Sequence, residues 1–384
     1  MNHRWIFGLL GAGALCVIGL RAVASTDPVA ASSGTASAES IPSVVTLEAG
    51  TTDDEVRVRL RRFDQPQPLR ELGTIRMTPS SAWRGALYQN AGRSAVLVVG
   101  ATLPLSSTSY DSALFLVENG TSRTLVTGLA HASGPLVTER GVVLVQRGRD
   151  GQEPSFPATG GQALAERVDS LEISAVDLST GVTRSVWRGE GPLAYLATAL
   201  HDNRVLIYHM APEGAYLRTL DTETRETTTV MGPMPALARD FSYDKLRNEV
   251  TFVRAERVGS ETYEIVTVAL SNGASRVRLR SPNEHLMPRV LRDGEIAFSS
   301  ANDQGLSLLR ASDTEGHSLA PLGAGSDAVV AEDGRGAWLA VRHLDPQTRL
   351  DSFAIVHRGT RQQFTFSDAN APVELVGFWQ GGSL

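Results

Sequence analysis

The feature that most constrains this chain is a strand-and-turn unit repeated along most of its length. The clearest copy, residues 291–316, contains two short apolar runs, Glu295–Ser300 and Leu306–Ala311. Sequences rich in Asp and Gly precede, separate and follow these runs. Short apolar runs bounded by Gly and Asp are typical of β-strands joined by tight turns. The unit therefore predicts strands, and its recurrence predicts a repeat protein.

The run at Ile296–Ser299 has counterparts at regular intervals. Equivalent runs begin at residues 96, 142, 205, 250, 296 and 338, so the spacing is 42 to 46 residues except for one interval of 63. The long interval contains an additional Gly-rich polar stretch, Arg147–Ser170. A shorter apolar run precedes each copy, and a strand, a polar turn and a further strand follow it. Four strands in about 40–50 residues is the size of one β-propeller blade.

Six such units occupy residues 75–366, and strand-like segments remain at both ends of the chain. Pro372–Trp379 is typical of an innermost strand, whereas Val44–Glu48, Val56–Phe63 and Leu69–Leu72 are typical of outer strands that lack one. Together they predict one more blade, which closes the ring and removes the exposed sheet edges. We therefore predict an all-β, seven-bladed β-propeller closed by the N- and C-terminal strands. Six blades, or a pair of two-sheet sandwiches, are the alternatives.

The N-terminal residues 1–24 predict an export signal. The apolar run Trp5–Leu20 follows Arg4, and the small residues Ala22 and Ala24 suit a cleavage site. The run is shorter than the roughly 20 residues that a membrane-spanning helix needs. Residues 25–43, rich in Ser and Ala, predict a flexible linker, and residues 44–384 the propeller domain. We expect a periplasmic or extracellular protein, with an N-terminal segment retained as a membrane anchor as the alternative.

The charge and the cysteine content exclude several classes of function. A net charge of −6 argues against nucleic-acid binding, which requires a basic face. The one cysteine, Cys16, lies in the export signal, so the rest of the chain has no thiol for a disulfide or a metal site. The usual metal and phosphate motifs are absent from the sequence, and we expect neither a metal nor a cofactor. Ser242–Lys245 matches the Ser-x-x-Lys motif but falls in a turn between strands, whereas that chemistry needs a helix.

Three fragments carry a resemblance to a known family. Leu291–Ser300, Ala331–Arg342 and Val176–Gly181 resemble the TolB-type, WD-like propeller repeat. Blades of that family carry a Pro/Asp-Asp-Gly turn, an Ile-Ala-Phe strand and an Asp-x-x-x-Gly hairpin; here Arg292 stands where proline is usual. TolB-type envelope proteins add a small α/β domain and related peptidases add a hydrolase domain, and we expect neither here. The resemblance therefore implies a free-standing, exported binding ring.

The residues that end the second strand of each unit predict a binding face. Equivalent positions in different blades of a propeller lie on one ring around the same face. Most of these residues are polar and some are cationic, which suits a carboxylate or an acidic peptide. The alternative explanation is that any strand becomes polar where it reaches solvent. The predicted face consists of Gln146, Arg147, His209, Arg254, Ser300, Arg342 and His343.

The predicted function is binding. We expect a non-enzymatic, monomeric ring, without catalytic residues, that binds a protein or an envelope component through this face. The alternative is a secreted lyase or lactonase acting on a sugar-derived substrate at the central channel. Such an enzyme would need carboxylates and histidines near the channel mouth, with Asp240, His285, Asp327 and Glu374 as the candidates. The 147–170 insertion overhangs the same face; long loops tend to be functional or disordered, and its candidate contacts are Arg149, Asp150, Glu153 and Phe156.

Overall fold

The computed structural model describes residues 41–52, 54–77, 83–90, 92–102, 112–129, 134–148, 170–190, 193–211, 213–234, 238–257, 259–300, 305–310, 313, 315–322, 325–345, 351–366 and 373–379. Within these residues the chain forms 28 strands, β1–β28, and the paired strands are antiparallel. No helix in this part of the chain has the length and apolar character needed to cross a membrane.

Six sheets contain these strands, and five of the sheets have four strands each. The first joins the two ends of the chain in the order β28 (Val373–Phe378), β1 (Val44–Ala49), β2 (Glu55–Arg61) and β3 (Arg70–Arg76). The next consists of β12 (Leu193–Ala199), β13 (Arg204–Ala211), β14 (Gly214–Asp221) and β15 (Thr227–Met234). It is followed by β16 (Ala238–Asp244), β17 (Glu249–Ala255), β18 (Tyr263–Ala269) and β19 (Ser275–Ser281). The last two contain β20 (Arg289–Val290), β21 (Ile296–Ser299), β22 (Leu306–Leu309) and β23 (His317–Ala320), then β24 (Ser326–Glu332), β25 (Trp338–Leu344), β26 (Asp351–His357) and β27 (Gln363–Phe366).

The remaining sheet has eight strands and divides into two groups. One group is β4 (Arg84–Asn90), β5 (Arg93–Ala101), β6 (Ser112–Glu118) and β7 (Thr121–Leu129). The other is β8 (Leu136–Val137), β9 (Val143–Gly148), β10 (Ser170–Val176) and β11 (Thr183–Glu190). The pair Leu129 and Arg147 connects β7 with β9 and so joins the two groups.

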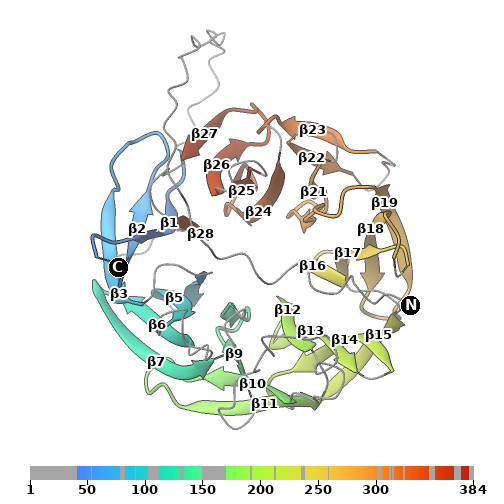
Figure 1. Ribbon diagram of the computed structural model, residues 1–384, viewed down its shortest axis with the longest axis horizontal. Helices are drawn as coiled ribbons and strands as arrows, with labels where there is room; N and C mark the ends of the chain where they lie inside the picture. The colour runs from blue at the N-terminus through green and yellow to red at the C-terminus, as the bar shows by residue number, and fades with distance from the viewer. Residues whose placement is uncertain are drawn as a thin grey trace. The chain divides into compact units, whose positions relative to one another are not determined.

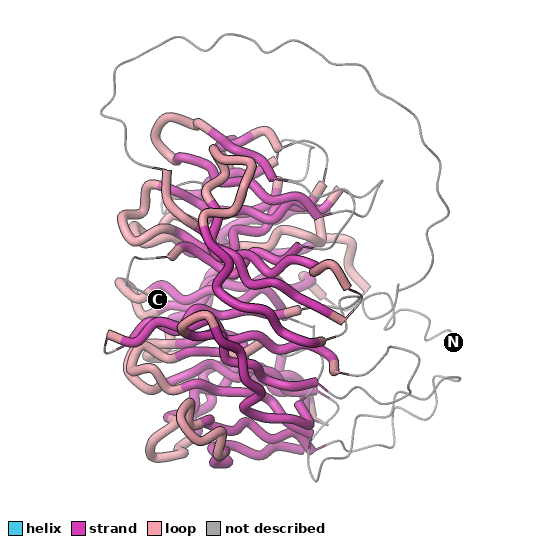
Figure 2. Tube along the Cα trace, turned by 90° about the vertical axis from the view of Figure 1, so that its left-hand side faces the viewer, coloured by secondary structure: helices cyan, strands magenta, loops and turns pink. Residues whose placement is uncertain are grey.

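The sheets follow one another around a ring (Figure 1). The first strand of each four-stranded group lies innermost, and these strands follow the cyclic order β28, β4, β8, β12, β16, β20, β24. Each contacts the next directly, apart from β20 and β24, where β21 makes the contact, and β24 contacts β28 again. In the side view, the described residues are strands joined by loops and turns (Figure 2).

Closure by the terminal strands confirms the sequence prediction. β1 pairs with β28 from Val44 opposite Phe378 to Glu48 opposite Val373. The backbone N–H of Trp379 also donates to the carbonyl oxygen of Ser43 at 2.9 Å. The edge of β1 that faces away from β2 is therefore paired with β28, the last strand of the chain, and is not left free.

The core lies between neighbouring sheets, which explains why the second strands are continuously apolar. In β5, Val96 and Val98 pack into the cluster shared with the first sheet. Their neighbours Leu97 and Val99 pack into the cluster shared with the β8–β11 group. Because alternate side chains of a strand point to opposite faces, a strand covered on both faces must be apolar throughout. Burying each such side chain contributes about 1.5–3 kcal/mol.

Aspartates fix the turns that follow the third strands. The Asp177 Oδ1 atom accepts hydrogen bonds from the backbone N–H groups of Ser179 and Thr180 at 2.8 and 2.9 Å. Asp221 does the same for Glu223 and Thr224, again at 2.8 and 2.9 Å. These bonds hold the pKa of both aspartates below the usual value. The recurring Asp of the hairpins therefore has a backbone role.

Candidate functional site

The predicted binding-face residues lie on the second strands, apart from Ser300, which directly follows β21, and most of them lie beside an innermost strand. Their backbones pair as expected for one end of the ring, with His209 opposite Ala194 and Arg254 opposite Ala238. In the last sheet Arg342 is opposite Ala328. The sequence positions that were aligned by repeat thus occupy corresponding places in successive sheets.

Several of these side chains make contacts inside the protein. The Gln146 side-chain amide donates to the carbonyl oxygen of Ala194 on β12 at 2.6 Å, which links two neighbouring groups of strands. His343 Nδ1 lies 2.8 Å from Oδ1 of Asp327, whose side chain is fully buried. These two predicted residues therefore connect strands.

The other predicted residues are also held in place. Arg147 donates to the Thr183 hydroxyl at 2.9 Å. His209 is buried and meets the Trp187 ring edge-on, with the ring centroids 5.4 Å apart. The backbone N–H of Ser300 donates to Gly305 at 2.9 Å, and Arg342 is partly buried on β25. The insertion residues Arg149, Asp150, Glu153 and Phe156 lie outside the described residues.

The four groups considered for an enzyme do not form one cluster. Asp327 is buried against His343, as above. Glu374 on β28 lies 3.9 Å from the Arg84 guanidinium on β4. Asp240 lies on β16, which is separated from β28 by β20 and β24 in the ring order. In the part of the chain that the structure describes, no group of three His, Cys, Asp or Glu side chains could hold a metal ion.

A polar cluster does form where β16 meets the segment before β20. We define it by Arg239, Asp240, Tyr263, Glu284 and His285. Nε of Arg239 lies 3.6 Å from Oδ2 of Asp240, and Nη2 of Arg239 donates to the carbonyl oxygen of Glu284. The Tyr263 hydroxyl donates to the Glu284 carboxylate at 3.1 Å, and His285 Nε2 lies 3.1 Å from the same carboxylate. The cluster thus offers donors and acceptors side by side.

Asp240 has an unusual backbone within this cluster. Its φ angle is 57°, in the left-handed region, and it lies where the pairing of β16 with β17 is irregular, between Arg239 and Ser242. Burial raises the pKa of the Asp240 carboxyl, although the charges of Arg239 and His285 act in the opposite direction. The side chain nevertheless keeps 34% of its surface exposed. A partly buried acid that remains open to solvent is a candidate functional group.

The predicted residue Arg254 lies in the same sheet as Arg239, Asp240 and Tyr263 of the cluster. Arg254 donates two hydrogen bonds to Glu264 at 3.1 and 3.2 Å, and Arg280 donates to the other oxygen of Glu264 at 3.0 Å. Glu264 follows Tyr263 on β18, but successive side chains of a strand point to opposite faces of the sheet, so this row of charges lies on the face opposite the Tyr263 side chain. The structure therefore places Arg254 in the same sheet as Tyr263 but in a separate row of charges, and it places Gln146 and His343 in other sheets.

The Ser-x-x-Lys motif has a structural explanation. Ser242 is buried on β16, and its hydroxyl accepts a hydrogen bond from the backbone N–H of Val290 at 2.8 Å. Lys245 bonds instead to Glu139 at 2.8 Å. The two side chains serve different contacts, and the motif lies on a strand and its turn.

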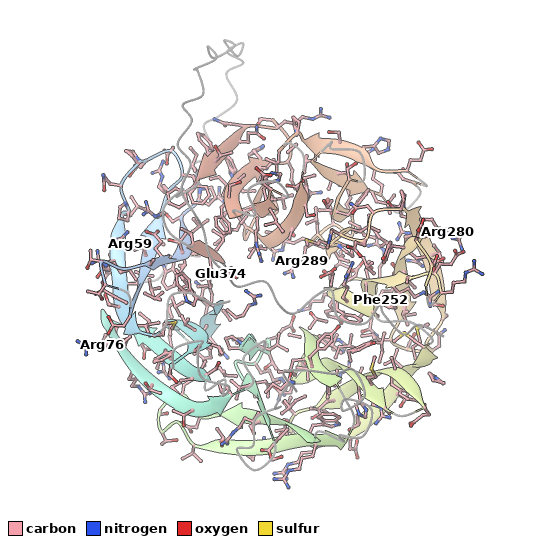
Figure 3. The ribbon with its side chains drawn as sticks, in the orientation of Figure 1. Arg59, Arg76, Phe252, Arg280, Arg289 and Glu374 are labelled. Atoms are coloured by element: carbon pink, nitrogen blue, oxygen red, sulfur yellow. The ribbon has the colours of Figure 1, made fainter. Side chains whose placement is uncertain are left out.

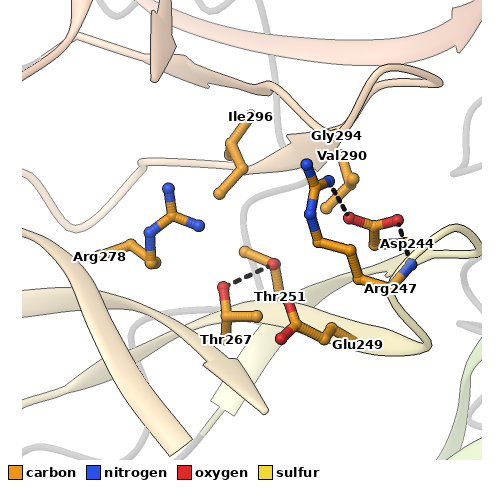
Figure 4. Close-up of a pocket in the computed structure, with 9 residues that line it drawn as sticks. All are labelled: Asp244, Arg247, Glu249, Thr251, Thr267, Arg278, Val290, Gly294 and Ile296. Carbon is orange, nitrogen blue, oxygen red and sulfur yellow. Dashed lines mark hydrogen bonds and ion pairs between the residues drawn. The ribbon is translucent and has the colours of Figure 1, made fainter. Parts of the chain in front are cut away.

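A small polar pocket lies between the β16–β19 and β20–β23 sheets (Figure 4). It has an empty volume of about 230 Å³ that includes open solvent. The Thr251 and Thr267 hydroxyls in it bond to each other at 2.9 Å, and Arg247 pairs with Asp244 at 2.7 Å. Both bonds lie within the β16–β19 sheet, and the Arg278 side chain reaches the neighbouring sheet by donating to the carbonyl oxygen of Arg310 at 2.9 Å.

No protein-family model and no curated protein sequence matches this chain. Solved structures do match its fold. A prolyl endopeptidase aligns over 87% of this chain at 10% identity with a TM-score of 0.54, and the chain covers 50% of that protein. A hypothetical selenium-binding protein from Sulfolobus tokodaii aligns over 88% of this chain and 94% of its own, at 8% identity and a TM-score of 0.55. An oligogalacturonate lyase from Vibrio parahaemolyticus aligns over 81% and 82%, at 12% identity and a TM-score of 0.50.

TolB from Acinetobacter baumannii also aligns, over 88% of this chain and 82% of its own, at 12% identity and a TM-score of 0.43. At 8–12% identity these similarities concern the fold alone. The matches with TM-scores of 0.50–0.55 and the four-stranded antiparallel sheets closed by β1 and β28 support the predicted β-propeller fold, and they do not show membership of a family.

Proposed function

We propose that this protein is an exported, non-enzymatic β-propeller that binds a protein or an envelope component through one end of its ring. The polar cluster of Arg239, Asp240, Tyr263, Glu284 and His285 carries the proposal. It offers a guanidinium, an imidazole, a phenol and two carboxylates, with Glu284 in contact with Arg239, Tyr263 and His285, and Asp240 3.6 Å from Arg239. Such a mixture suits recognition of a polar partner surface.

The number of blades belongs to the same proposal. We propose seven blades, with the eight-stranded sheet counted as two. In support, that sheet divides into β4–β7 and β8–β11, and the pair Leu129–Arg147 joins the two groups. Counted in this way, every group has four strands and contributes one strand to the innermost ring.

Export is proposed from the sequence. Residues 1–24 have the pattern of an export signal and residues 25–43 that of a linker, which would place the ring in the periplasm or outside the cell. The predicted face residues Gln146, Arg147, His209, Arg254, Ser300, Arg342 and His343 belong to the proposed binding end, with Arg254 in the same sheet as Tyr263 of the polar cluster.

A binding role is preferred to catalysis because the acid and base groups are dispersed. Asp327 is buried against His343, and Glu374 is beside Arg84. General acid–base chemistry needs two such groups within reach of one substrate atom. Asp240 and His285 alone share a neighbourhood, and both already contact other members of the polar cluster.

The proposal is tested by capture of a partner from native envelope extract with the tagged full-length protein. His285→Ala should abolish the capture of a partner that the wild type retains. His317→Ala is the matched control, because His317, on the outer strand β23, has its Nε2 atom 3.2 Å from Asp313, much as His285 Nε2 lies 3.1 Å from Glu284. Equal capture by His285→Ala and wild type would refute a role for the polar cluster.

A further inference from the structure

Charged side chains on the innermost strands lie beside groups of opposite or complementary charge, with one exception among the described residues. The partners are Glu374 with Arg84 at 3.9 Å, Asp240 with Arg239 at 3.6 Å, Asp244 with Arg247 at 2.7 Å, Asp327 with His343 at 2.8 Å and Glu332 with Arg358 at 3.3 Å. The exception is Arg289 on β20, to which no described residue makes a hydrogen bond or an ion pair. Among the described innermost strands, Arg289 is thus the charged side chain that lacks a partner of opposite charge.

The Arg289 side chain is exposed to solvent and also has protein atoms close to its guanidinium. Its surface is exposed, and Figure 3 shows it with Glu374 on the inner side of the ring, whereas Arg59, Arg76 and Arg280 lie on the outer side. Protein atoms surround the guanidinium closely enough that burial lowers its pKa, and only the charge of Glu332 acts in the opposite direction. Glu332 already accepts bonds from Arg358 and from the backbone N–H of Arg292. Because the side chain also remains exposed, the charge of Arg289 is met by solvent and by no ion pair with a described residue.

The backbone of Arg289 is fixed by two sheets. Arg289 pairs with Ala297 and Val290 with Ile296 on β21. The N–H of Val290 also donates to the buried hydroxyl of Ser242 on β16. The guanidinium is thus presented from a rigid strand, and a ligand that binds it would not have to order the backbone first.

We propose that Arg289 is an anion-binding site at the centre of the ring, which takes an oxyanion group of a ligand, either a carboxylate or a phosphate. The planar fork of a guanidinium matches both groups through two parallel hydrogen bonds. An anion would supply the hydrogen bonds and the charge that Arg289 lacks. This inference goes beyond the proposed function, because no residue of the polar cluster takes part in it.

The test uses calorimetric titration of the full-length protein, at low ionic strength, with citrate in one series and inorganic phosphate in another. Saturable binding of at least one anion is expected. Arg289→Gln should weaken it at least tenfold, and Arg289→Lys, which keeps the charge but not the fork, should weaken it less. Arg76→Gln is the matched control and should bind as the wild type, because Arg76 is an exposed arginine on the outer strand β3.

Thermal unfolding in the same buffers separates a binding role from a structural one. Without an anion, Arg289→Gln should unfold at the wild-type temperature or above, because it removes an uncompensated charge. With a saturating anion, only the wild type and Arg76→Gln should gain in melting temperature. Binding of citrate alone identifies a carboxylate ligand, and binding of phosphate alone a phosphorylated one.

Two results would overturn the inference. They are the absence of saturable binding of both anions by the wild type, and equal binding by Arg289→Gln. Either result leaves the partner-capture experiment with His285→Ala unaffected, so the two proposals fail independently.

Discussion

At the scale of single residues, Asp240 combines an unfavourable backbone conformation with an environment that is unfavourable for its ionised carboxyl. A left-handed backbone is unfavourable for most residues, although Asp and Asn tolerate it best. Burial also disfavours the ionised carboxyl, which is why its pKa is raised. A side chain kept despite both effects is better explained by binding than by folding.

Asp240→Asn should therefore stabilise the protein at neutral pH. The folded protein, with the raised pKa, holds the proton to higher pH than the unfolded chain does, so stability falls as pH rises from the carboxyl's usual pKa of 3.8 through the folded pKa. Asparagine keeps the left-handed backbone and removes the charge. The gain in melting temperature should be present above the folded pKa and disappear at lower pH, as followed by circular dichroism.

The matched control is Asp202→Asn. Asp202 has nearly the same backbone, with a φ of 58°, but its side chain is 59% exposed in a turn and pairs at 3.2 Å with Arg140, which is also exposed. Exposed pairs contribute about 0–1 kcal/mol. Its substitution should leave the melting temperature nearly unchanged. A similar gain for both variants would mean that the benefit comes from the backbone and not from the charge.

At the scale of elements, the sequence predicts strands best where both faces are buried. The second strands, such as Val96–Val99, have an unbroken apolar run and were located from it. The innermost strand β20 has two residues, one of them an exposed arginine, and carries no periodic signal. The contacts of Gln146 with Ala194 and of Ser242 with Val290 join different sheets. No local pattern encodes them, so the polar cluster and Arg289 required the structure.

The first two strands illustrate how charge stabilises an element inside the ring. Glu48 on β1 is buried and accepts hydrogen bonds from Arg59 at 2.6 Å, Arg61 at 2.7 Å and Thr46 at 2.7 Å. The Arg61 guanidinium in turn lies 4.7 Å from the centroid of the Phe366 ring on β27. Burial alone would raise the pKa of Glu48, but the bonds from Arg61, Thr46 and Arg59 outweigh it and lower the pKa.

Glu48→Gln should destabilise the protein by about 3–5 kcal/mol at neutral pH, because it leaves Arg61 buried without its counter-charge. Since the folded pKa is lowered, the stabilisation is present above the carboxyl's usual pKa of 4.5 and is lost as pH falls through the folded pKa. Urea unfolding at neutral pH and in acid should show a penalty that shrinks in acid. Glu71→Gln on β3 is the control: Glu71 is exposed and 3.8 Å from Arg59, so the change should cost less than about 1 kcal/mol. Equal penalties for both variants would contradict the argument.

At the scale of the whole molecule, closure depends on two segments from opposite ends of the sequence. Val44 is opposite Phe378, and Trp379 bonds to Ser43 at 2.9 Å, so the start of β1 and the end of β28 are close enough for a hairpin turn. The buried residues Leu375 and Phe378 of β28 pack with Trp338 of the preceding sheet. β28 therefore joins the first sheet by hydrogen bonds and the last sheet by apolar contacts.

A circular permutant tests this closure. Trp379 is joined to Ser43 by a short Gly-rich turn, and the chain is opened between residues 190 and 193, where one group of strands ends and the next begins. If the ring depends on pairing and not on chain order, the permutant should keep the wild-type circular dichroism spectrum and a single cooperative urea transition. A truncation after residue 372 removes β28, exposes the edge of β1, and should lower both the stability and the cooperativity. The permutant keeps the pairing of β1 with β28 and changes only the chain order. If it unfolds like the truncation, the pairing alone is not sufficient to stabilise the ring, and the native chain order is needed as well.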